Sequence, residues 1–191
     1  MVRAGIVPAE GGWVSATGQS HWVFGYGSLI WLPGFRFRQR QQALLRGAHR
    51  SLCIYSHRHR GTPQAPGLVF GLTRGGSCNG MAFEVAAEDW PETRDYLRER
   101  EQVSGVYREA MRSVRLADGQ AVEALVFLVD PGHAQYAGRL DVTEQLRLVR
   151  RSHGRSGPNR DYVINTARHL EDLGVADAYL SALARLLEAE G

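Results

Sequence analysis

The order of strand-like and helix-like segments most constrains what this chain can fold into. From Trp22 to Val129, short apolar and β-branched runs alternate with turn residues. One segment with a helical period, 88–101, interrupts these runs, and the chain beyond Thr143 is mostly helical. Strands that come first and helices that finish the chain predict an α+β fold with a largely antiparallel sheet, open or closed.

The expected elements follow from periodicity and from the placement of Gly, Pro and Asp. Strands are predicted at 22–24, 43–55, 68–72, 79–86, 106–116 and 121–129. Gly47 suggests a bulge in the second strand, and 73–78 suggests a tight connection between the third and fourth. Helices are predicted over 88–101, over 143–152 with Asp141 or Thr143 as the cap, up to Leu173 before a closing Gly174, and from a capping Asp177 to Leu187.

A chain of 191 residues is most simply one folded unit with a substantial core. Residues 1–20 are rich in Gly, Ala and Ser and are predicted to be a flexible lead-in, which leaves 21–191 as a single domain. No apolar run reaches the length of a membrane span, and the first residues lack the character of a signal peptide. Cys53 and Cys78 lack the spacing of metal ligands or of a disulfide scaffold, which favours buried thiols and a reducing cytoplasm.

The basic residues are unusual in kind and in layout. All 23 are arginines, and no Asp or Glu lies between Gly11 and Phe83. The arginines of this acid-free span are Arg36, Arg38, Arg40, Arg46, Arg50, Arg58, Arg60 and Arg74. They suit a nucleic-acid surface, or the capture of a small acidic substrate, because a guanidinium binds a carboxylate through two hydrogen bonds. The third alternative is a solvated surface whose arginines pair with acids from the other half of the chain.

The stretch 21–31 holds the strongest candidate for a binding loop. Its residues 22–24 are apolar, the sequence Gly-Tyr-Gly-Ser at 25–28 breaks that run, and apolar residues resume at Leu29. Two glycines let the backbone approach a ligand closely or adopt φ > 0, and successive N–H groups in such a loop can hold negative charge. An ordinary hairpin turn is the alternative.

Glu101 is the candidate for acid–base chemistry. It ends the predicted helix on the stripe that carries Trp90 and Leu97, whereas Glu99 lies about 200° away around the helix. An inward glutamate in partly apolar surroundings has a raised pKa, which suits general acid–base catalysis near neutral pH. The alternative is a surface carboxylate paired with an arginine of the same helix, Arg94, Arg98 or Arg100.

Motifs for several other chemistries are missing from the sequence. Ser28 lies in Gly-Tyr-Gly-Ser-Leu and not in the Gly-x-Ser-x-Gly elbow of esterases. There is no phosphate loop or dinucleotide fingerprint, and His57 and His59 have no neighbouring cluster in the sequence to complete a metal site. The sequence therefore predicts neither a cofactor nor a metal.

Several motifs together resemble those of the ChaC-like γ-glutamylcyclotransferases. The matching segments, in the family's order, are WVFGYGSLIW at 22–31, HRGTP at 59–63, PG at 66–67, GGSC at 75–78 with Gly80, YL at 96–97, RE at 100–101 and SGPN at 156–159 with Tyr162. They span nearly the whole chain after residue 20, and their shared order is more specific than any single motif. The chain departs from the family after Glu101, where a longer connection leaves the place of Tyr107 open.

The resemblance implies a compact α+β domain built round a small mixed, mainly antiparallel β-barrel with flanking helices. It implies cleavage of a γ-glutamyl amide with release of 5-oxoproline. For the ChaC branch the substrate is glutathione, and the second product is cysteinylglycine. Carried over by motif, the catalytic carboxylate is Glu101. The substrate-binding residues are Tyr26, Gly27, Ser28, Leu29 and Tyr162. No cofactor, metal, nucleic acid or membrane is implied.

Alternatives of the same and of another class remain open at the level of sequence. A cyclotransferase for other γ-glutamyl amino acids or amines would use the same chemistry with a different leaving group. An arginine-rich nucleic-acid-binding module would lose affinity steeply with salt and form no 5-oxoproline. A catalytically inactive scaffold is disfavoured by the presence of Glu101.

Overall fold

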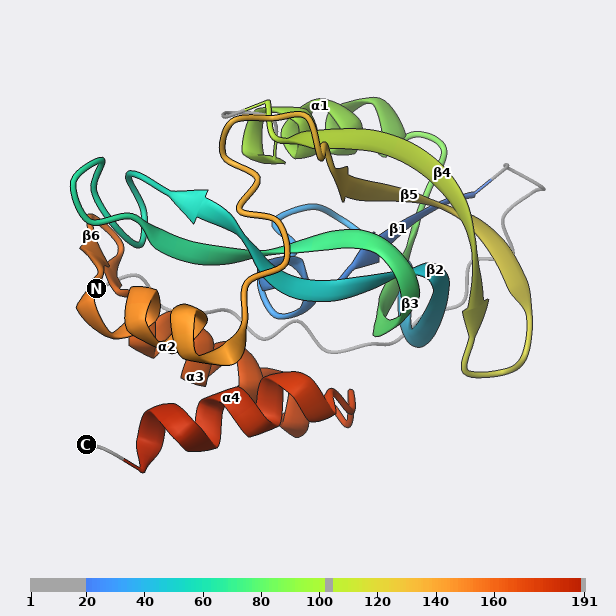
Figure 1. Ribbon diagram of the computed structural model, residues 1–191. Helices are drawn as coiled ribbons and strands as arrows, with labels where there is room; N and C mark the ends of the chain where they lie inside the picture. Colours follow the sequence, from blue (N-terminus) through green and yellow to red (C-terminus); the bar gives the residue numbers. More distant parts are fainter. Residues whose placement is uncertain (1–19, 102–104, 190–191) are drawn as a thin grey trace, which may run out of the picture.

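Five strands close into a barrel in the computed structural model, which describes residues 20–101 and 105–189 (Figure 1). The strands are β1 (His21–Gly25), β2 (Gln39–Ser56), β3 (Gly67–Val85), β4 (Tyr107–Leu116) and β5 (Ala121–Val129). Their order around the barrel is β1-β3-β2-β4-β5, and every pair is antiparallel except β1 with β5. That parallel pair, with Trp22 opposite Ala124, closes the barrel. The predicted α+β fold with a mixed, mainly antiparallel barrel is confirmed.

The tight connection predicted at 73–78 is wrong, because β3 continues through it as one strand. The register slips at Gly47, which lies opposite Gly75 and Gly76. These three glycines have φ angles of +84°, +96° and +69°, which side chains other than glycine rarely allow. Both strands therefore bend together at this point and the ladder resumes beyond it. The bulge predicted at Gly47 is confirmed.

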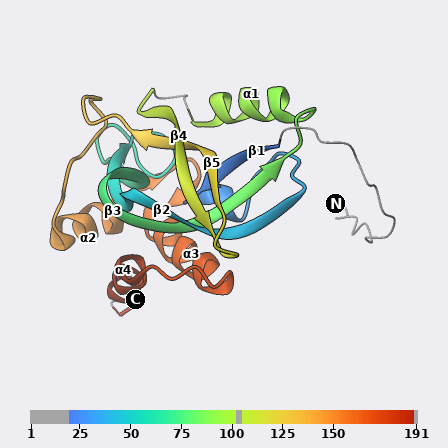
Figure 2. The same ribbon diagram turned by 90° about the vertical axis from the view of Figure 1, so that its right-hand side faces the viewer.

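Helices cover two sides of the barrel (Figures 1 and 2). α1 (Trp90–Glu101) lies on one side, and α2 (Val142–Arg151), α3 (Asn159–Asp172) and α4 (Ala178–Glu188) lie together on the other. Leu97 of α1 belongs to the apolar core of the barrel itself. A second core packs the β2–β3 ribbon against the three C-terminal helices through residues such as Phe70, Leu146 and Leu180.

The ends of these helices follow their capping residues. Asp141, and not Thr143, caps α2, because its side chain accepts a hydrogen bond from the N–H of Glu144 at 2.8 Å. Asp177 caps α4 in the same way, at 2.9 Å, as predicted. Gly174 follows α3 with φ of +67° and closes it, again as predicted.

Two short elements border the region where the motifs of the sequence analysis meet. η1 (Ser28–Ile30), one turn of 3-10 helix, follows β1. β6 (His153–Gly154) and β7 (Gly157–Pro158) form a small hairpin before α3. Strands of two residues are too short to be predicted from a periodic pattern in the sequence. The predicted lead-in lies outside the described residues except for Ser20. Within the described part of the chain, no helix is both long and apolar enough to cross a membrane.

Candidate active site

A small cavity of about 50 Å³ lies where the loop after β1, the end of α1 and the first turn of α3 come together. Its lining residues are Tyr26, Gly27, Ser28, Leu29, Phe70, Glu101, Tyr107, Phe127 and Tyr162. The cavity therefore unites all six residues that the sequence analysis assigned to the site. Phe70, Tyr107 and Phe127, from three strands of the barrel, complete its walls.

The loop 25–28 leaves β1 at Gly25, which is closely packed. A Cβ on Gly25 would lie 3.1 Å from the Cβ of Leu29 and 3.2 Å from the ring of Phe83. A Cβ on Gly27 would meet nothing within 4 Å, so this glycine borders open space beside the cavity. Neither glycine has a positive φ. Of the two uses predicted for them, positive φ is absent, and close approach of the backbone to a ligand stays a prediction.

The first turn of η1 leaves backbone donors available at the cavity. The N–H of Ile30 donates to the Gly27 carbonyl at 2.9 Å, and the N–H of Leu32 donates to the Ser28 carbonyl at 2.9 Å. Among the described residues, none accepts a hydrogen bond from the N–H groups of Gly27, Ser28 or Leu29. Three consecutive donors at the start of a helical turn form a partial positive charge next to the cavity.

Glu101 ends α1 and contributes its side chain to the cavity wall. The Glu101 side chain is 17% exposed, whereas Glu99 is an exposed residue. Leu97, one turn earlier on the same face, is buried in the barrel core and draws this face of the helix inward. The predicted contrast between the two glutamates is therefore confirmed.

Arg100 joins this carboxylate to the loop; the sequence analysis considered it only as a possible partner of Glu101 and assigned it no contact with the loop. Its Nε lies 3.3 Å from the Oε1 of Glu101, and its Nη2 donates to the Ser28 hydroxyl at 2.8 Å. Its Nη1 donates to the Leu32 carbonyl at 2.7 Å. Arg94 and Arg98, the other candidate partners, instead pair with Glu109 on β4. The adjacency of Arg100 to Glu101 in the RE motif was the signal that could have identified it.

Burial governs the proton affinity of the groups in the cavity. It raises the pKa of Glu101 above its ordinary value, and the guanidinium of Arg100 opposes the shift. Burial also raises the pKa of Tyr26 and of Tyr107 well above the usual range, and raises the pKa of Tyr162 to about 12. The three phenols therefore stay neutral near pH 7, and Glu101 is the lining group suited to exchange protons there.

Tyr107 and Tyr162 flank the backbone of Phe70. The Tyr107 hydroxyl donates to the Phe70 carbonyl at 2.9 Å, and the Tyr162 hydroxyl accepts from the Phe70 N–H at 3.4 Å. The place of Tyr107 was open in the sequence because a longer connection precedes it. β4 begins at this residue and sets its side chain on the cavity wall.

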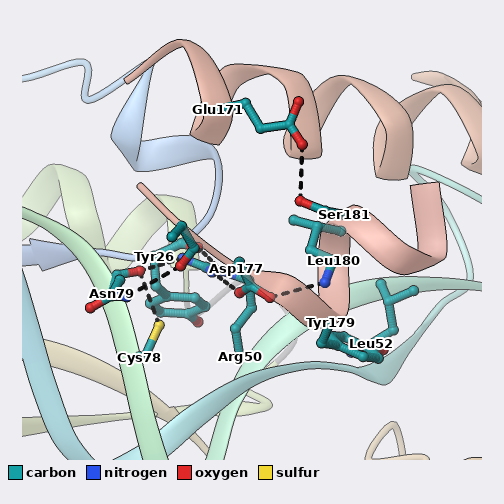
Figure 3. A network of polar contacts seen from close by, with 11 residues as sticks. Tyr26, Arg50, Leu52, Cys78, Asn79, Glu171, Asp177, Tyr179, Leu180 and Ser181 are labelled. Carbon is teal, nitrogen blue, oxygen red and sulfur yellow. Dashed lines mark hydrogen bonds and ion pairs between the residues drawn. The ribbon is translucent and has the colours of Figure 1, made fainter. Parts of the chain in front are cut away.

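Arg50 ties the loop after β1 to the C-terminal helix (Figure 3). It is 3% exposed, its Nε donates to the Tyr26 carbonyl at 2.5 Å, and its Nη2 donates to the Asn79 carbonyl at 2.8 Å. Its Nη1 forms an ion pair with Asp177, the residue that caps α4. One buried guanidinium thus connects the cavity loop to the first turn of α4.

Several arginines of the acid-free span pair with acids from the rest of the chain. Arg36, Arg38 and Arg50 pair with Asp89, Glu88 and Asp177, respectively. For these three, the structure supports the alternative in which the two halves of the chain neutralise one another. Because Arg50 is buried, it is also unavailable to a nucleic-acid surface.

The His and Cys residues considered for metal or thiol chemistry are not among the residues that line the cavity. Within the described ranges, no three or more His, Cys, Asp or Glu side chains are arranged to hold a metal ion. The Nδ1 of His59 lies 3.0 Å from the Ser156 hydroxyl. Cys53 and Cys78 are buried free thiols, and burial raises their pKa to about 12 and about 11. Thiols with such pKa values are poor nucleophiles near neutral pH.

Comparison with known sequences points to one family. A family model described as ChaC-like protein matches residues 21–190. The glutathione-specific gamma-glutamylcyclotransferase of Escherichia coli (strain K12) is 33% identical over 162 residues, which are 85% of this chain and 70% of that protein. Glutathione-specific gamma-glutamylcyclotransferase 1 of Mus musculus is 30% identical over 181 residues, which are 92% of this chain and 81% of that protein.

Comparison with solved structures gives a matching fold. The crystal structure of a γ-glutamyl cyclotransferase specific to glutathione from yeast superposes with a TM-score of 0.80. The match covers 89% of this chain and 96% of the yeast chain, at 23% sequence identity. At this level of identity the likeness concerns the arrangement of the barrel and its helices.

Proposed function

Because this chain belongs to the ChaC-like family, we propose that it is an enzyme, a glutathione-specific γ-glutamylcyclotransferase. It releases 5-oxoproline and cysteinylglycine, and its place is the reducing cytoplasm, where glutathione and the two buried cysteines stay as thiols. The observation that carries the proposal is the cavity itself. A partly buried glutamate with a raised pKa and three unused backbone N–H donors line the same small space.

The reaction needs positioning more than it needs auxiliary chemistry. The α-amine nitrogen of the γ-glutamyl group attacks its own γ-carbonyl carbon and closes a five-membered lactam. The bond from that carbon to the cysteine nitrogen then breaks, so no water or cofactor is consumed. Holding the reacting groups in an aligned, folded-back conformer can contribute up to about 7–11 kcal/mol in intramolecular reactions.

Glu101 is assigned both proton transfers. As a carboxylate it accepts the proton that the attacking amine gives up, and as a carboxylic acid it delivers that proton to the departing cysteine nitrogen. The raised pKa of Glu101 brings its two protonation states closer in free energy near neutral pH, which favours both steps. The neighbouring tyrosines cannot replace it, because their hydroxyls hold their protons far above pH 7.

The loop 25–29 is assigned the stabilisation of developing charge. As the amine attacks, the γ-carbonyl oxygen becomes an oxyanion, and the N–H groups of Gly27, Ser28 and Leu29 are the available backbone donors. Removing one such donor from an oxyanion hole typically costs about 2.7–4 kcal/mol. Arg100 holds this loop at Ser28 and Leu32, so the donors stay fixed relative to Glu101.

The size of the cavity indicates which part of glutathione it receives. Sites that enclose a whole drug-sized ligand measure about 300–1,000 Å³. A volume of about 50 Å³ suits only the reacting end of a tripeptide. The cysteinylglycine portion therefore extends past the cavity wall, and the choice of leaving group is made outside it.

The direct test is incubation of the purified protein with glutathione, followed by detection of 5-oxoproline and cysteinylglycine. Glu101→Gln is expected to lower the turnover number by about 10²- to 10⁴-fold, the usual contribution of a positioned acid–base group. Glu99→Gln is the matched control, because it makes the same change on an exposed face of the same helix. Substantial turnover in Glu101→Gln would remove Glu101 from the mechanism.

The alternative leaving groups are tested in the same assay. Simple γ-glutamyl amino acids share the reacting end of glutathione, so a cyclotransferase of broader selectivity would convert them at comparable rates. The proposal expects glutathione to be strongly preferred. A protein that forms no 5-oxoproline from any γ-glutamyl compound would not be a cyclotransferase.

A further inference from the structure

Arg60 stands next to the cavity but is not part of its lining. It lies in the connection between β2 and β3, and its guanidinium carbon sits 4.9 Å from the centre of the Tyr162 ring. Tyr162 lines the cavity that contains Glu101. A positive charge is therefore held one side chain away from the proposed reaction centre, over the face of an aromatic ring.

The backbone of Arg60 is fixed by neighbours that leave no room for side chains. A Cβ on Gly67 would lie 2.2 Å from the Arg60 carbonyl oxygen, and a Cβ on Gly154 would lie 2.4 Å from the carbonyl of His59. The N–H of Arg60 donates to the Ser56 hydroxyl at 3.0 Å. These contacts hold the backbone of Arg60 between β3 and the β6–β7 hairpin, so the fold fixes the position from which its side chain extends.

The hairpin also brings a second arginine to the same place. The N–H of Arg155 donates to the Arg58 carbonyl at 2.9 Å, and its Nη2 lies 3.3 Å from Nε2 of His59. The pKa of His59 is lowered, first by burial and then by Arg155, Arg58 and Arg60, which places three positive charges around one imidazole. We name Arg58, Arg60 and Arg155 the hairpin arginines.

The hairpin arginines differ from Arg50 and Arg100, the other arginines near the cavity, because no described acidic side chain pairs with them. Arg50 and Arg100 each contact a carboxylate, whereas no described Asp or Glu forms an ion pair with any hairpin arginine. The Nη1 of Arg60 donates to the Ser156 carbonyl at 2.5 Å, and its other guanidinium donors have no acceptor among the described residues. Arginine carries five such donors in a plane that matches a carboxylate.

We propose that Arg60, assisted by the charge of Arg155, binds the glycyl carboxylate of glutathione and so selects the cysteinylglycine leaving group. This inference rests on the proposed function of the cavity. In glutathione, two residues separate the γ-carbonyl from the terminal carboxylate, a reach of about 7 Å when extended. The proposal requires this length to carry the substrate from the cavity past the ring of Tyr162 to the Arg60 guanidinium, whose carbon lies 4.9 Å from the ring centre.

The test combines a change in the protein with a matching change in the substrate. Arg60→Gln keeps a polar side chain but removes the charge and the guanidinium donors, and glutathione esterified at glycine loses the charge on the other side. For glutathione, Arg60→Gln is expected to lower kcat/KM by about tenfold, the lower end for a charge-assisted hydrogen bond, mainly through KM. For the glycine ester, the variant and the wild type are expected to be equal.

Arg74→Gln on β3 is the matched control, since Arg74 is exposed and does not line the cavity. It is expected to leave both substrates unaffected. A purely structural role for Arg60, through Ser156 and Tyr162, would lower the rates for glutathione and its ester equally, and that result overturns the proposal. Equal rates for glutathione in Arg60→Gln and wild type overturn it as well.

A binding measurement separates this proposal from the proposed function. Calorimetric titration of Glu101→Gln with glutathione and with its glycine ester reports affinity without turnover. In the double variant that combines Glu101→Gln with Arg60→Gln, the affinity for glutathione is expected to fall to the affinity for the ester. If the protein binds glutathione more tightly than the ester but the wild type forms no 5-oxoproline, the subsite is supported and the assigned reaction is wrong. If glutathione and the ester bind with equal affinity, the subsite is excluded.

Discussion

Arg100 and Ser28, from the end of α1 and the loop after β1, are joined by a hydrogen bond of 2.8 Å. The same guanidinium lies 3.3 Å from the carboxylate of Glu101. One side chain therefore sets the distance between the group assigned to proton transfer and the backbone assigned to charge stabilisation. Because these parts come from distant segments, small changes at Arg100 are expected to have large effects on catalysis.

Arg100→Gln is expected to lower kcat/KM by about 10²-fold, because a misplacement of roughly 1 Å in a catalytic group has that effect. The loop would lose its hydrogen bonds at Ser28 and Leu32. Arg98→Gln is the control, since Arg98 sits half a turn away and pairs with Glu109 instead. Steady-state kinetics that show equal effects of the two substitutions would contradict a positioning role for Arg100.

The pH dependence of kcat/KM should carry the signature of Glu101. Its pKa is raised by burial, so the carboxylate needed to accept the first proton disappears as pH falls through a value above that of an ordinary glutamate. The acid limb of the profile is therefore expected at higher pH than an ordinary glutamate would give. In Arg100→Gln this limb should move to still higher pH, because Arg100 opposes the shift. A limb that stays in place in this variant would argue against their electrostatic coupling.

Glu101→Gln is expected to stabilise the folded protein at neutral pH. A glutamate whose pKa is higher in the folded than in the unfolded state contributes stability below the unfolded pKa and loses it as pH rises through the folded pKa. At pH 7 the ionised, desolvated carboxylate is therefore a net cost, and glutamine removes it. Thermal unfolding should show a higher Tm for Glu101→Gln, with Glu99→Gln unchanged. A lower Tm would mean that the pair with Arg100 outweighs desolvation.

Arg50→Met should unfold more readily by about 3–5 kcal/mol, the usual result of removing one partner from a buried ion pair. The substitution leaves Asp177 uncompensated and deprives the carbonyls of Tyr26 and Asn79 of their donors (Figure 3). Urea denaturation with unchanged m-values measures the difference. Arg147→Gln, in an exposed pair with Glu144, should cost less than about 0.5 kcal/mol. A similarly small effect at Arg50 would show that the buried network is dispensable.

Six of the nine residues that line the cavity could be predicted, because each lies in a motif and the order of the motifs fits one family. Phe70 and Phe127 lie in none of these motifs, and the place of Tyr107 was open. Glu101 could also be separated from Glu99 by helical period alone, since Leu97 marks the inward face. The contacts of Arg100 and Arg50 with the loop after β1 and its surroundings were not predicted. Both side chains donate to backbone carbonyls, which every residue has, so no residue type in the sequence marks the acceptor. Their partners Leu32, Tyr26 and Asn79 became visible only when distant strands and helices were placed together.

The main error in the fold has a comparable cause. Gly75 and Gly76 satisfy the rules for a tight turn as well as those for a bulge, since both conformations use positive φ. What decides between them is the partner strand, where Gly47 kinks at the matching position. That information is non-local, so composition between residues 73 and 78 could not supply it.

The parallel pairing of β1 with β5 has a consequence for the order in which the parts of the molecule fold. The barrel can close only when Trp22 pairs with Ala124, about 100 residues later in the chain. Asp177 lies later still, and its ion pair fixes Arg50, which donates to the Tyr26 carbonyl. Contacts between such distant segments are intrinsically slow to form. The loop after β1 is thus synthesised before the segments that hold it in place. We expect nascent or C-terminally shortened chains to be catalytically silent, so that the appearance of activity reports the completion of folding.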